Sequence, residues 1–494
     1  GIALTGHPSG GAEMAPQIYF QEPGQDIVWR WVLPGPTSLE REESMTAKTA
    51  ASMALHLDRE IVMNECYGAY GWRLTVSEMK WLADWLFVRG TNFLMPHAFY
   101  YSVEGPRLRE RPPDLAWSNL WWRHYRKFAD YTRRMSWLMR GGAPVADVAI
   151  LALGGEARWR AAKILYESQI DFLYLDESLL ERARFRKGRL ELGVASHRLV
   201  LLDGAGDLTP ATRKRLRRLL DAGIPVLAFD SPLNSHPILG GAGHDLTIRN
   251  VPDATALRTA IEELIGRDVR TEPPQPDLRY AHRVKDGTHF YLLTNEGNDT
   301  IRTNVSFRQP GRPELWDAET GQFRPAPTTI EMYPRNSRLF AFTGLTCEAD
   351  WAPLPEVTEE VTLPASGWNL TTQNRDFGET GLGSWTRLDG MDSFSGAGWY
   401  QRVETISPRW LDGGERVLLD AGDVREFAEV EINGRPAGVR LWPPFRFDIT
   451  EALVPGRNTI RLGVTNTRAN ELTKEKLPSG LLGPVRLLLV RSSR

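Results

Sequence analysis

The chain has 494 residues, of which 60 are Lys or Arg and 62 are Asp or Glu, so its formal net charge is −2. This length indicates roughly three or four domains, because single hydrophobic cores seldom extend beyond ~250–300 residues. A content of 41% hydrophobic and 25% charged residues is typical of globular proteins and excludes a disordered or collagen-like chain. Balanced charge without a long basic run also argues against a nucleic-acid partner.

Cysteine content and hydropathy exclude further classes of protein. Only Cys66 and Cys347 occur, far apart, so the sequence supports neither a disulfide framework nor a cysteine zinc site. No apolar run approaches the ~18–20 residues that cross a bilayer, and the first residues lack the charged and apolar regions of a signal peptide. We therefore expect no membrane partner, while the oligomeric state stays open. The 17 Trp, 13 Tyr and 18 Phe residues are expected mostly in cores, with some free to stack on sugar rings.

Residues 1–143 alternate short apolar runs with amphipathic stretches, a pattern typical of strands followed by helices. Strands are predicted at residues 2–5, 27–32, 61–64 and 92–96. A helix is predicted after Thr75, because Thr75 and Glu78 have capping-box spacing and the helical pattern stops at Gly90. A second helix is predicted at residues 121–139. Strand–helix–strand units form parallel sheets, whose functional loops follow the carboxyl ends of the strands.

Residues 144–271 show the same alternation with different content. The strand-like runs VADVAILAL, DFLYL and RLVLLDG alternate with helical stretches at residues 158–167 and 210–220. This pattern predicts a small, doubly wound, flavodoxin-like α/β domain. It contains neither G-x-G-x-x-G after a strand nor a P-loop motif, so the sequence predicts no nucleotide-phosphate site.

Helical patterns disappear after the proline-rich segment 272–276. Residues 277–345 contain short alternating strands separated by turn residues, which predicts a small β domain. Residues 365–494 contain further strands at the spacing of a β-sandwich. We expect most tryptophans of this sandwich in its inter-sheet core, with sugar binding as the alternative. They are Trp368, Trp385, Trp399 and Trp442.

Glu65 is the strongest candidate for a catalytic residue. The apolar strand at residues 61–64 leads directly into Glu65. The loop that follows contains three aromatic residues, Tyr67, Tyr70 and Trp72. A carboxylate at the carboxyl end of a buried strand costs free energy unless it is paired or serves chemistry. Glycoside hydrolysis uses such a fixed carboxylate, and the three aromatic residues would then bind the sugar; the alternative is a structural Glu65 paired with an arginine or with loop amides.

The next strand ends at His97, which is followed by Tyr100 and Tyr101. We expect His97 to hydrogen-bond a sugar hydroxyl or to orient Glu65, and the tyrosines to supply stacking faces and phenol donors. The alternative is a histidine with a purely structural hydrogen bond. On either interpretation the sequence assigns no residue to a metal site.

Two-carboxylate hydrolysis requires a second acid, which the sequence does not assign. None of the available acids follows a predicted strand in the way that Glu65 does. They are Glu22, Asp26, Glu40 and Glu43. Glu65 is therefore predicted to act as base or nucleophile, and the choice between inversion and retention stays open.

Several motifs resemble the second half of the catalytic barrel of family 106 α-L-rhamnosidases. They are N-E-C-Y-G-A-Y-G-W, D-W-L-F-V-R-G-T-N, H-A-F-Y-Y-S, P-P-D and W-W-R-H-Y. The resemblance implies that residues 1–143 are the C-terminal part of a (β/α)8-type barrel. A complete barrel takes about 250 residues, so either the barrel is partial here or its first strands belong to N-terminal sequence missing from this chain.

The resemblance extends over nearly the whole chain. The α/β segment 144–271 resembles the amidotransferase-like domain that follows such barrels, and residues 314–321 resemble the β segment of the same architecture. Residues 396–400, 431–434 and 447–450 resemble the galactose-binding-like, jelly-roll β-sandwich of family 2 glycosidases.

The resemblance implies a glycoside hydrolase that acts on plant or microbial polysaccharide, with α-L-rhamnosidase-like specificity. It implies Glu65 as a catalytic carboxylate, His97 and Tyr101 as sugar-binding neighbours, calcium at the sugar site and a secreted or periplasmic location. No cluster of oxygen ligands at recognisable spacing places the calcium. The alternatives are a β-galactosidase-like glycosidase and a non-catalytic carbohydrate-binding or scaffold protein.

Overall fold

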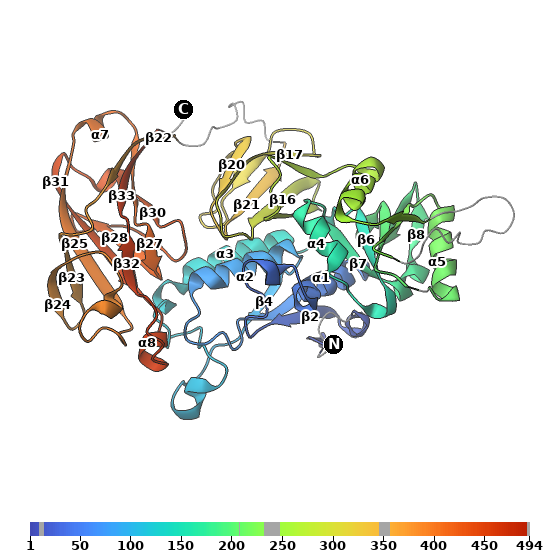
Figure 1. The fold of residues 1–494 in the computed structure, drawn as a ribbon, viewed down its shortest axis with the longest axis horizontal. Coiled ribbons are helices and arrows are strands. Elements are labelled where there is room, and N and C mark those ends of the chain that lie inside the picture. Colours follow the sequence, from blue (N-terminus) through green and yellow to red (C-terminus); the bar gives the residue numbers. More distant parts are fainter. Residues whose placement is uncertain (9–13, 207, 232–247, 345–355, 492–494) are drawn as a thin grey trace. The chain divides into compact units, whose positions relative to one another are not determined.

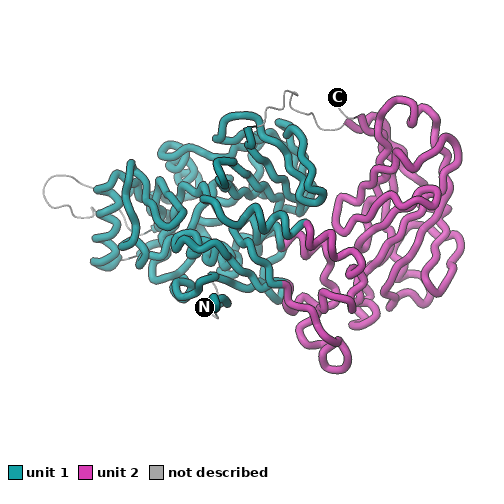
Figure 2. The backbone as a smooth tube through the Cα atoms, turned by 180° about the vertical axis from the view of Figure 1, so that it is seen from behind, with its two compact units in different colours: residues 1–66, 83–95, 131–351 teal, residues 67–82, 96–130, 352–494 magenta. Residues whose placement is uncertain are grey.

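The computed structural model describes residues 1–8, 14–206, 208–231, 248–344 and 356–491, so Cys347 lies outside the described residues. The chain divides into two compact units (Figure 2). The first comprises residues 1–66, 83–95 and 131–351, and the second comprises residues 67–82, 96–130 and 352–494. In the described part of the chain, no helix combines the length and apolar character needed to cross a membrane.

The first unit begins with a four-stranded sheet in the order β1-β2-β3-β4. Its strands are β1 (Thr5–Gly6), β2 (Glu22–Ile27), β3 (Met63–Cys66) and β4 (Phe93–Pro96). The pairings of β1 with β2 and of β2 with β3 are parallel. Helices α1 (Thr46–His56) and α2 (Val76–Val88) connect successive strands, and α3 (Tyr125–Met139) follows β4. The predicted strand and helix alternation is therefore present, and Thr75 Oγ1 accepts the predicted capping bond from Glu78 N at 3.0 Å.

One predicted strand is wrong in position. The prediction at residues 27–32 falls on a bend in which Trp29 and Arg30 have positive φ angles, whereas β2 ends at Ile27. Pro23 and Gly24 lie inside β2, although both residue types generally weaken a strand. Gly24 is needed because β1 passes very close to it, and a Cβ there would lie 2.6 Å from the carbonyl oxygen of Gly6.

Helix α1 packs against both β2 and β7 and so joins the first sheet to the next one (Figure 1). All of its residues are buried, as expected for a helix enclosed between two sheets. Its one cation, Lys48, donates from Nζ to Asp171 Oδ1 at 2.6 Å. Burial lowers the pKa of Lys48, and the Asp171 carboxylate opposes that change.

A five-stranded sheet in the order β13-β12-β11-β6-β7 follows, and its neighbouring strands are all parallel. Its strands are β6 (Val148–Ala152), β7 (Phe172–Asp176), β11 (Leu199–Asp203), β12 (Val226–Phe229) and β13 (Arg249–Val251). The helices are α4 (Arg160–Glu167), α5 (Pro210–Asp221) and α6 (Ala254–Ile265). A small antiparallel sheet is inserted after β7, with strands β8 (Arg184–Arg186), β9 (Arg189–Leu192) and β10 (Ala195–His197). Continuous apolar strands such as β6 are typical of a parallel sheet buried on both faces.

Two antiparallel sheets complete the first unit. One contains β14 (Val269–Glu272), β17 (Ile301–Phe307) and β20 (Thr329–Met332). The other contains β19 (Phe323–Pro325), β18 (Glu314–Trp316), β21 (Ser337–Phe342), β16 (Thr288–Asn295), β15 (Leu278–Lys285) and β5 (Ala143–Pro144), in that order. The sheets thus take in β5 and β14, which precede the predicted β segment in the chain.

The β part of the second unit contains two larger antiparallel sheets and one two-stranded sheet. The first has the order β22 (Glu356–Thr362), β33 (Arg486–Arg491), β26 (Arg416–Asp420), β30 (Arg446–Asp448). The second has the order β24 (Asp376–Thr380), β23 (Trp368–Thr372), β25 (Ala397–Ile406), β31 (Gly456–Thr465), β28 (Phe427–Ile432), β29 (Arg435–Arg440). The third pairs β27 (Asp423–Arg425) with β32 (Gly480–Gly483), and short helices are α7 (Arg409–Asp412) and α8 (Ala469–Leu472). Trp368, Trp385 and Trp442 are buried, and Trp368 and Trp385 belong to the hydrophobic core of this β part.

Candidate active site

Glu65 lies on β3 and pairs in register with Asp26 on β2. Side chains at paired positions of neighbouring parallel strands leave the sheet on the same face, and the strands are ~4.8 Å apart. Both side chains are partly exposed, Glu65 by 30% and Asp26 by 18%. The fold therefore places two carboxyl groups side by side, near the carboxyl ends of adjacent strands.

His7 joins these two carboxyl groups. It directly follows β1, and its Nδ1 lies 3.6 Å from Asp26 Oδ1 while its Nε2 lies 3.6 Å from Glu65 Oε2. The imidazole thus occupies the space between the two carboxyl groups, with a side chain that is 37% exposed. Three adjacent strands, β1, β2 and β3, each contribute one titratable side chain to this cluster.

The electrostatics of the cluster raise the pKa of Asp26. Burial raises the pKa of Asp26, the Glu65 carboxylate raises it further, and His7 opposes both effects. Two neighbouring carboxyl groups disfavour each other's ionisation, so a pair of this kind is costly unless it serves chemistry.

The sequence interpretation missed Asp26 and His7 as members of this site. Asp26 was among the available acids, but the strand predicted at residues 27–32 placed it before a strand instead of near the end of one. No local pattern marks His7, because its contacts depend on the pairing of β1 with β2. The bend after β2 also exposes Trp29 and Trp31, which offer flat indole faces after the strand that carries Asp26.

The three loop aromatics that were predicted to bind sugar are buried. Tyr67, Tyr70 and Trp72 are at most 1% exposed. The Tyr67 hydroxyl donates to Met79 O at 3.0 Å, and Trp72 Nε1 donates to Leu108 O at 2.9 Å. Their rings serve as packing for the loop after β3 and offer no face to a sugar, so their prediction as substrate-binding residues is corrected.

His97, Tyr100 and Tyr101 have different environments in the second unit. His97 is half-buried, and its ring lies edge-on to that of Tyr100 with centroids 6.2 Å apart. The Tyr100 hydroxyl donates to the backbone of Glu110 at 2.6 Å, and burial raises the pKa of Tyr100. Tyr101 is 90% exposed and keeps a free ring face. Sugar contact by His97 and Tyr101 stays a prediction, whereas the Tyr100 hydroxyl already has a backbone partner.

The same region of the second unit contains an exposed aromatic group, whose members come from the H-A-F-Y-Y-S and W-W-R-H-Y motifs. Phe99 and Trp122 are exposed, and both rings contact Tyr125, with centroids 5.8 and 5.4 Å apart. The neighbouring Trp121 is buried. The sequence motif does not distinguish the adjacent Trp121 and Trp122. Their positions relative to α3 decide which of the two faces solvent.

The family resemblance implies calcium, and the described residues do not fit a calcium site. Calcium takes six to eight oxygen ligands. In the part of the chain that the structure describes, no group of three or more His, Cys, Asp or Glu side chains is arranged to hold a metal ion. At Asp26 and Glu65, the His7 ring lies between the carboxyl groups.

The fold and the site together define the class of protein. Carboxyl groups at the ends of parallel strands, accompanied by a separate α/β part and antiparallel sheets, are features of multidomain glycoside hydrolases. The model of glycoside hydrolase family 106, described as alpha-L-rhamnosidase, matches residues 28–330, which is more than half of the chain. The chain belongs to this family.

Two comparisons extend over different parts of the chain. A protein of Formosa agariphila named "Putative beta-glucuronidase" is 33% identical over 202 residues, which cover 39% of this chain and 16% of that protein. The structure of a rhamnosidase from Novosphingobium sp. PP1Y matches 99% of this chain with a TM-score of 0.73 at 19% identity. The fold is therefore shared along nearly the whole chain. This chain spans 53% of the rhamnosidase structure and a much smaller part of the Formosa protein.

Proposed function

We propose that this chain is a glycosidase that hydrolyses α-L-rhamnosidic bonds in plant or microbial polysaccharide, with Glu65 as a catalytic carboxylate. The observation that carries the proposal is the pairing of Glu65 with Asp26 beside His7, at the carboxyl ends of adjacent parallel strands. Membership of family 106 supports the substrate class. The names of the two relatives, a rhamnosidase and a β-glucuronidase, agree on O-glycosyl hydrolysis but differ in the sugar.

The proposed architecture assigns each part of the chain a place in this function. Residues 1–143 form part of a (β/α)8-type barrel, which the four-stranded sheet and its connecting helices support. Residues 144–271 form an amidotransferase-like α/β domain, residues 277–345 a small β domain, and residues 365–494 a galactose-binding-like sandwich. Trp368 and Trp385 contribute to the hydrophobic core of the sandwich itself.

The chemistry follows from the position of the carboxyl pair. In its carboxylate form, Glu65 activates water or attacks the anomeric carbon. Asp26 and His7 act as positioning residues, because each contacts or pairs with Glu65 and limits its orientation. Trp29, Trp31 and Tyr101 are the exposed aromatics proposed to contact sugar, and His97 is proposed to bond a hydroxyl group.

The test compares the wild type with Glu65→Gln on a panel of aryl glycosides that includes α-L-rhamnoside, β-D-galactoside and β-D-glucuronide. Glu65→Gln should lower kcat by about 10²–10⁴-fold, the contribution typical of a positioned acid or base. Glu104→Gln, which changes an exposed glutamate in a loop, is the matched control and should keep full activity.

The possible outcomes separate the candidate functions. Hydrolysis that is undiminished in Glu65→Gln would reject this site. Turnover of the galactoside alone would replace rhamnosidase by β-galactosidase-like activity. Sugar binding by calorimetry without any turnover in the wild type would favour a carbohydrate-binding or scaffold protein.

A further inference from the structure

A pocket of about 380 Å³ lies in the first unit between α3, the strand β18 with the turn after it, and β21, and it includes none of the residues His7, Asp26 or Glu65. Its volume falls in the range of ~300–1,000 Å³ that is typical of small-molecule sites. Trp137 on α3 and Trp316 on β18 line it from different elements. We propose that this pocket is a second, non-catalytic saccharide site that holds one sugar ring of a polysaccharide chain.

The wall formed by α3 is held in place by two cationic side chains. Arg134 donates from Nη1 to the carbonyl oxygens of Ala318 and Glu319, at 2.9 and 3.0 Å, and so ties the turn after β18 to the helix. Lys285 Nζ lies 3.8 Å from the centroid of the Trp137 ring and donates to Trp137 O at 2.9 Å. Trp137 is 54% exposed and yet anchored, so binding costs little further ordering of this side chain.

The opposite wall is equally fixed. Trp316 Nε1 donates to Glu314 Oε2 at 2.8 Å, and the buried Glu314 also accepts from Thr343 Oγ1 at 2.7 Å. The turn closes at Gly321, where a Cβ would lie 3.3 Å from Arg134 Nε. Both indoles are therefore positioned before any ligand binds.

The composition of the pocket suits a sugar ring. A pyranose ring has C–H faces that suit indoles and hydroxyl groups around its edge that need polar partners. Beside the two indoles, the pocket is lined by polar side chains that can bond those hydroxyl groups: Gln322, Arg133, Arg134 and Asp317. The choice of a saccharide rests on the proposed function, since it takes the carbohydrate class from the glycosidase reaction.

The test uses 19F NMR of the full chain labelled with 5-fluorotryptophan, in the Glu65→Gln background so that no sugar is consumed. The resonance of Trp137 is assigned by its loss in Trp137→Phe. Titration with L-rhamnose and with a neutral rhamnose-containing oligosaccharide should shift the Trp137 and Trp316 resonances, with Kd values in the millimolar range (about −4 kcal/mol). Trp137→Ala should raise Kd by about tenfold or more, and Gln322→Ala should weaken binding less.

A matched control and two contrary outcomes make the test decisive. Trp117→Ala removes another exposed indole, outside the pocket, and should leave Kd unchanged. Unchanged Trp137 and Trp316 resonances at saturating sugar would overturn the proposal. So would binding of anilinonaphthalene sulfonate that the sugars do not displace. Aryl-glycoside turnover without these shifts refutes the second site alone, whereas shifts without any turnover refute the proposed hydrolase and leave the site standing.

Discussion

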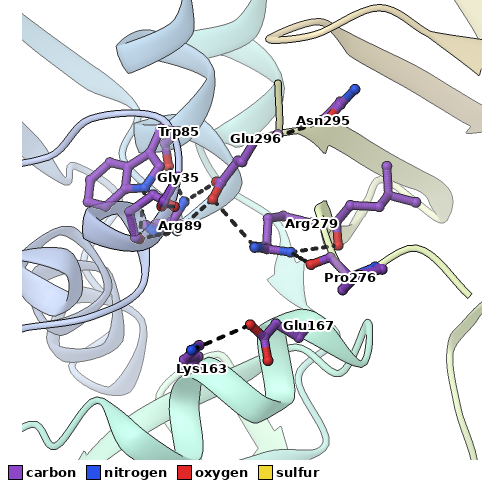
Figure 3. Close-up of polar contacts among 12 residues, drawn as sticks. Gly35, Trp85, Arg89, Lys163, Glu167, Pro276, Arg279, Asn295 and Glu296 are labelled. Atoms are coloured by element: carbon purple, nitrogen blue, oxygen red, sulfur yellow. Dashed lines mark hydrogen bonds and ion pairs between the residues drawn. The ribbon is translucent and has the colours of Figure 1, made fainter. Parts of the chain in front are cut away.

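The buried charge cluster around Glu296 is expected to stabilise the first unit more than an exposed ion pair does. Glu296 lies after β16, and its carboxylate accepts from Arg89 Nη1 at 2.5 Å and from Arg89 Nη2 at 3.2 Å (Figure 3). Arg279 Nε lies 3.4 Å from the same carboxylate, and all three side chains are at most 2% exposed. Arg89 also donates to Trp85 O and Ser38 O, so the cluster joins α2 to the loop after β2 and to the antiparallel β part.

Glu296→Gln keeps the shape of this side chain and removes its charge. Two buried guanidinium groups then lose their carboxylate, and breaking a buried pair in this way costs about 3–5 kcal/mol. Burial already lowers the pKa of Arg279, and the Glu296 carboxylate is the largest effect that opposes this change. We therefore expect the free energy of unfolding to fall by about 3–5 kcal/mol. The control Glu263→Gln removes an exposed pair with Arg249 at 2.8 Å and should cost at most about 1 kcal/mol.

Urea unfolding followed by tryptophan fluorescence measures both variants against the wild type. A lower midpoint at an unchanged slope reports lost stability, whereas a changed slope reports a different unfolding unit. If Glu296→Gln shifted the midpoint no further than Glu263→Gln does, the inference that burial makes this cluster stabilising would be refuted.

Three further predictions concern the candidate site and its sheet. The raised pKa of Asp26 means that this group stabilises the folded chain fully below its ordinary value of 3.8, and that this contribution is lost as pH rises through the raised pKa. Asp26→Asn should flatten that loss in urea unfolding measured across this pH range, and an unaltered pH profile would contradict the assignment. Tyr67→Ala empties a buried position and should lower the free energy of unfolding by about 3–5 kcal/mol. Tyr101→Ala changes an exposed position and should raise KM without changing Tm. Equal Tm values for the two variants would contradict this difference. Gly24→Ala brings a Cβ to 2.6 Å from Gly6 O and should cost about 1–3 kcal/mol by calorimetry, unless β1 moves away without loss.

The first sheet shows which features a sequence pattern can predict. β3 begins two residues after the start of the predicted strand, and Glu65 lies within it. The strand and the helix after it could be predicted because an apolar run and a capping box are both local signals. Local signals do not predict β2, because Pro23 and Gly24 are residue types that usually interrupt a strand. The close approach of β1 nevertheless requires the glycine. The error displaced one strand and thereby concealed the role of Asp26.

A local sequence pattern also does not predict whether an aromatic side chain in a loop is buried or exposed. Tyr67 and Tyr101 both follow a strand end, yet one is buried and the other is almost fully exposed. Burial in a loop depends on which distant segments cover it, as Leu108 covers Trp72 by accepting its indole N–H. Composition can therefore predict an aromatic-rich site without identifying which rings face the substrate.

The contacts of Glu65 support the proposed chemical role over a structural one. A structural glutamate at this position would be locked against an arginine, but among the described residues the Glu65 carboxyl group lies 3.6 Å from His7 Nε2. Its neighbour in register is a second acid whose pKa is raised, so the sheet keeps two carboxyl groups together near the carboxyl ends of its strands at a cost in stability. Groups arranged against stability in this way concentrate at functional sites. The cost of this pair is therefore an argument for the proposed reaction at Glu65.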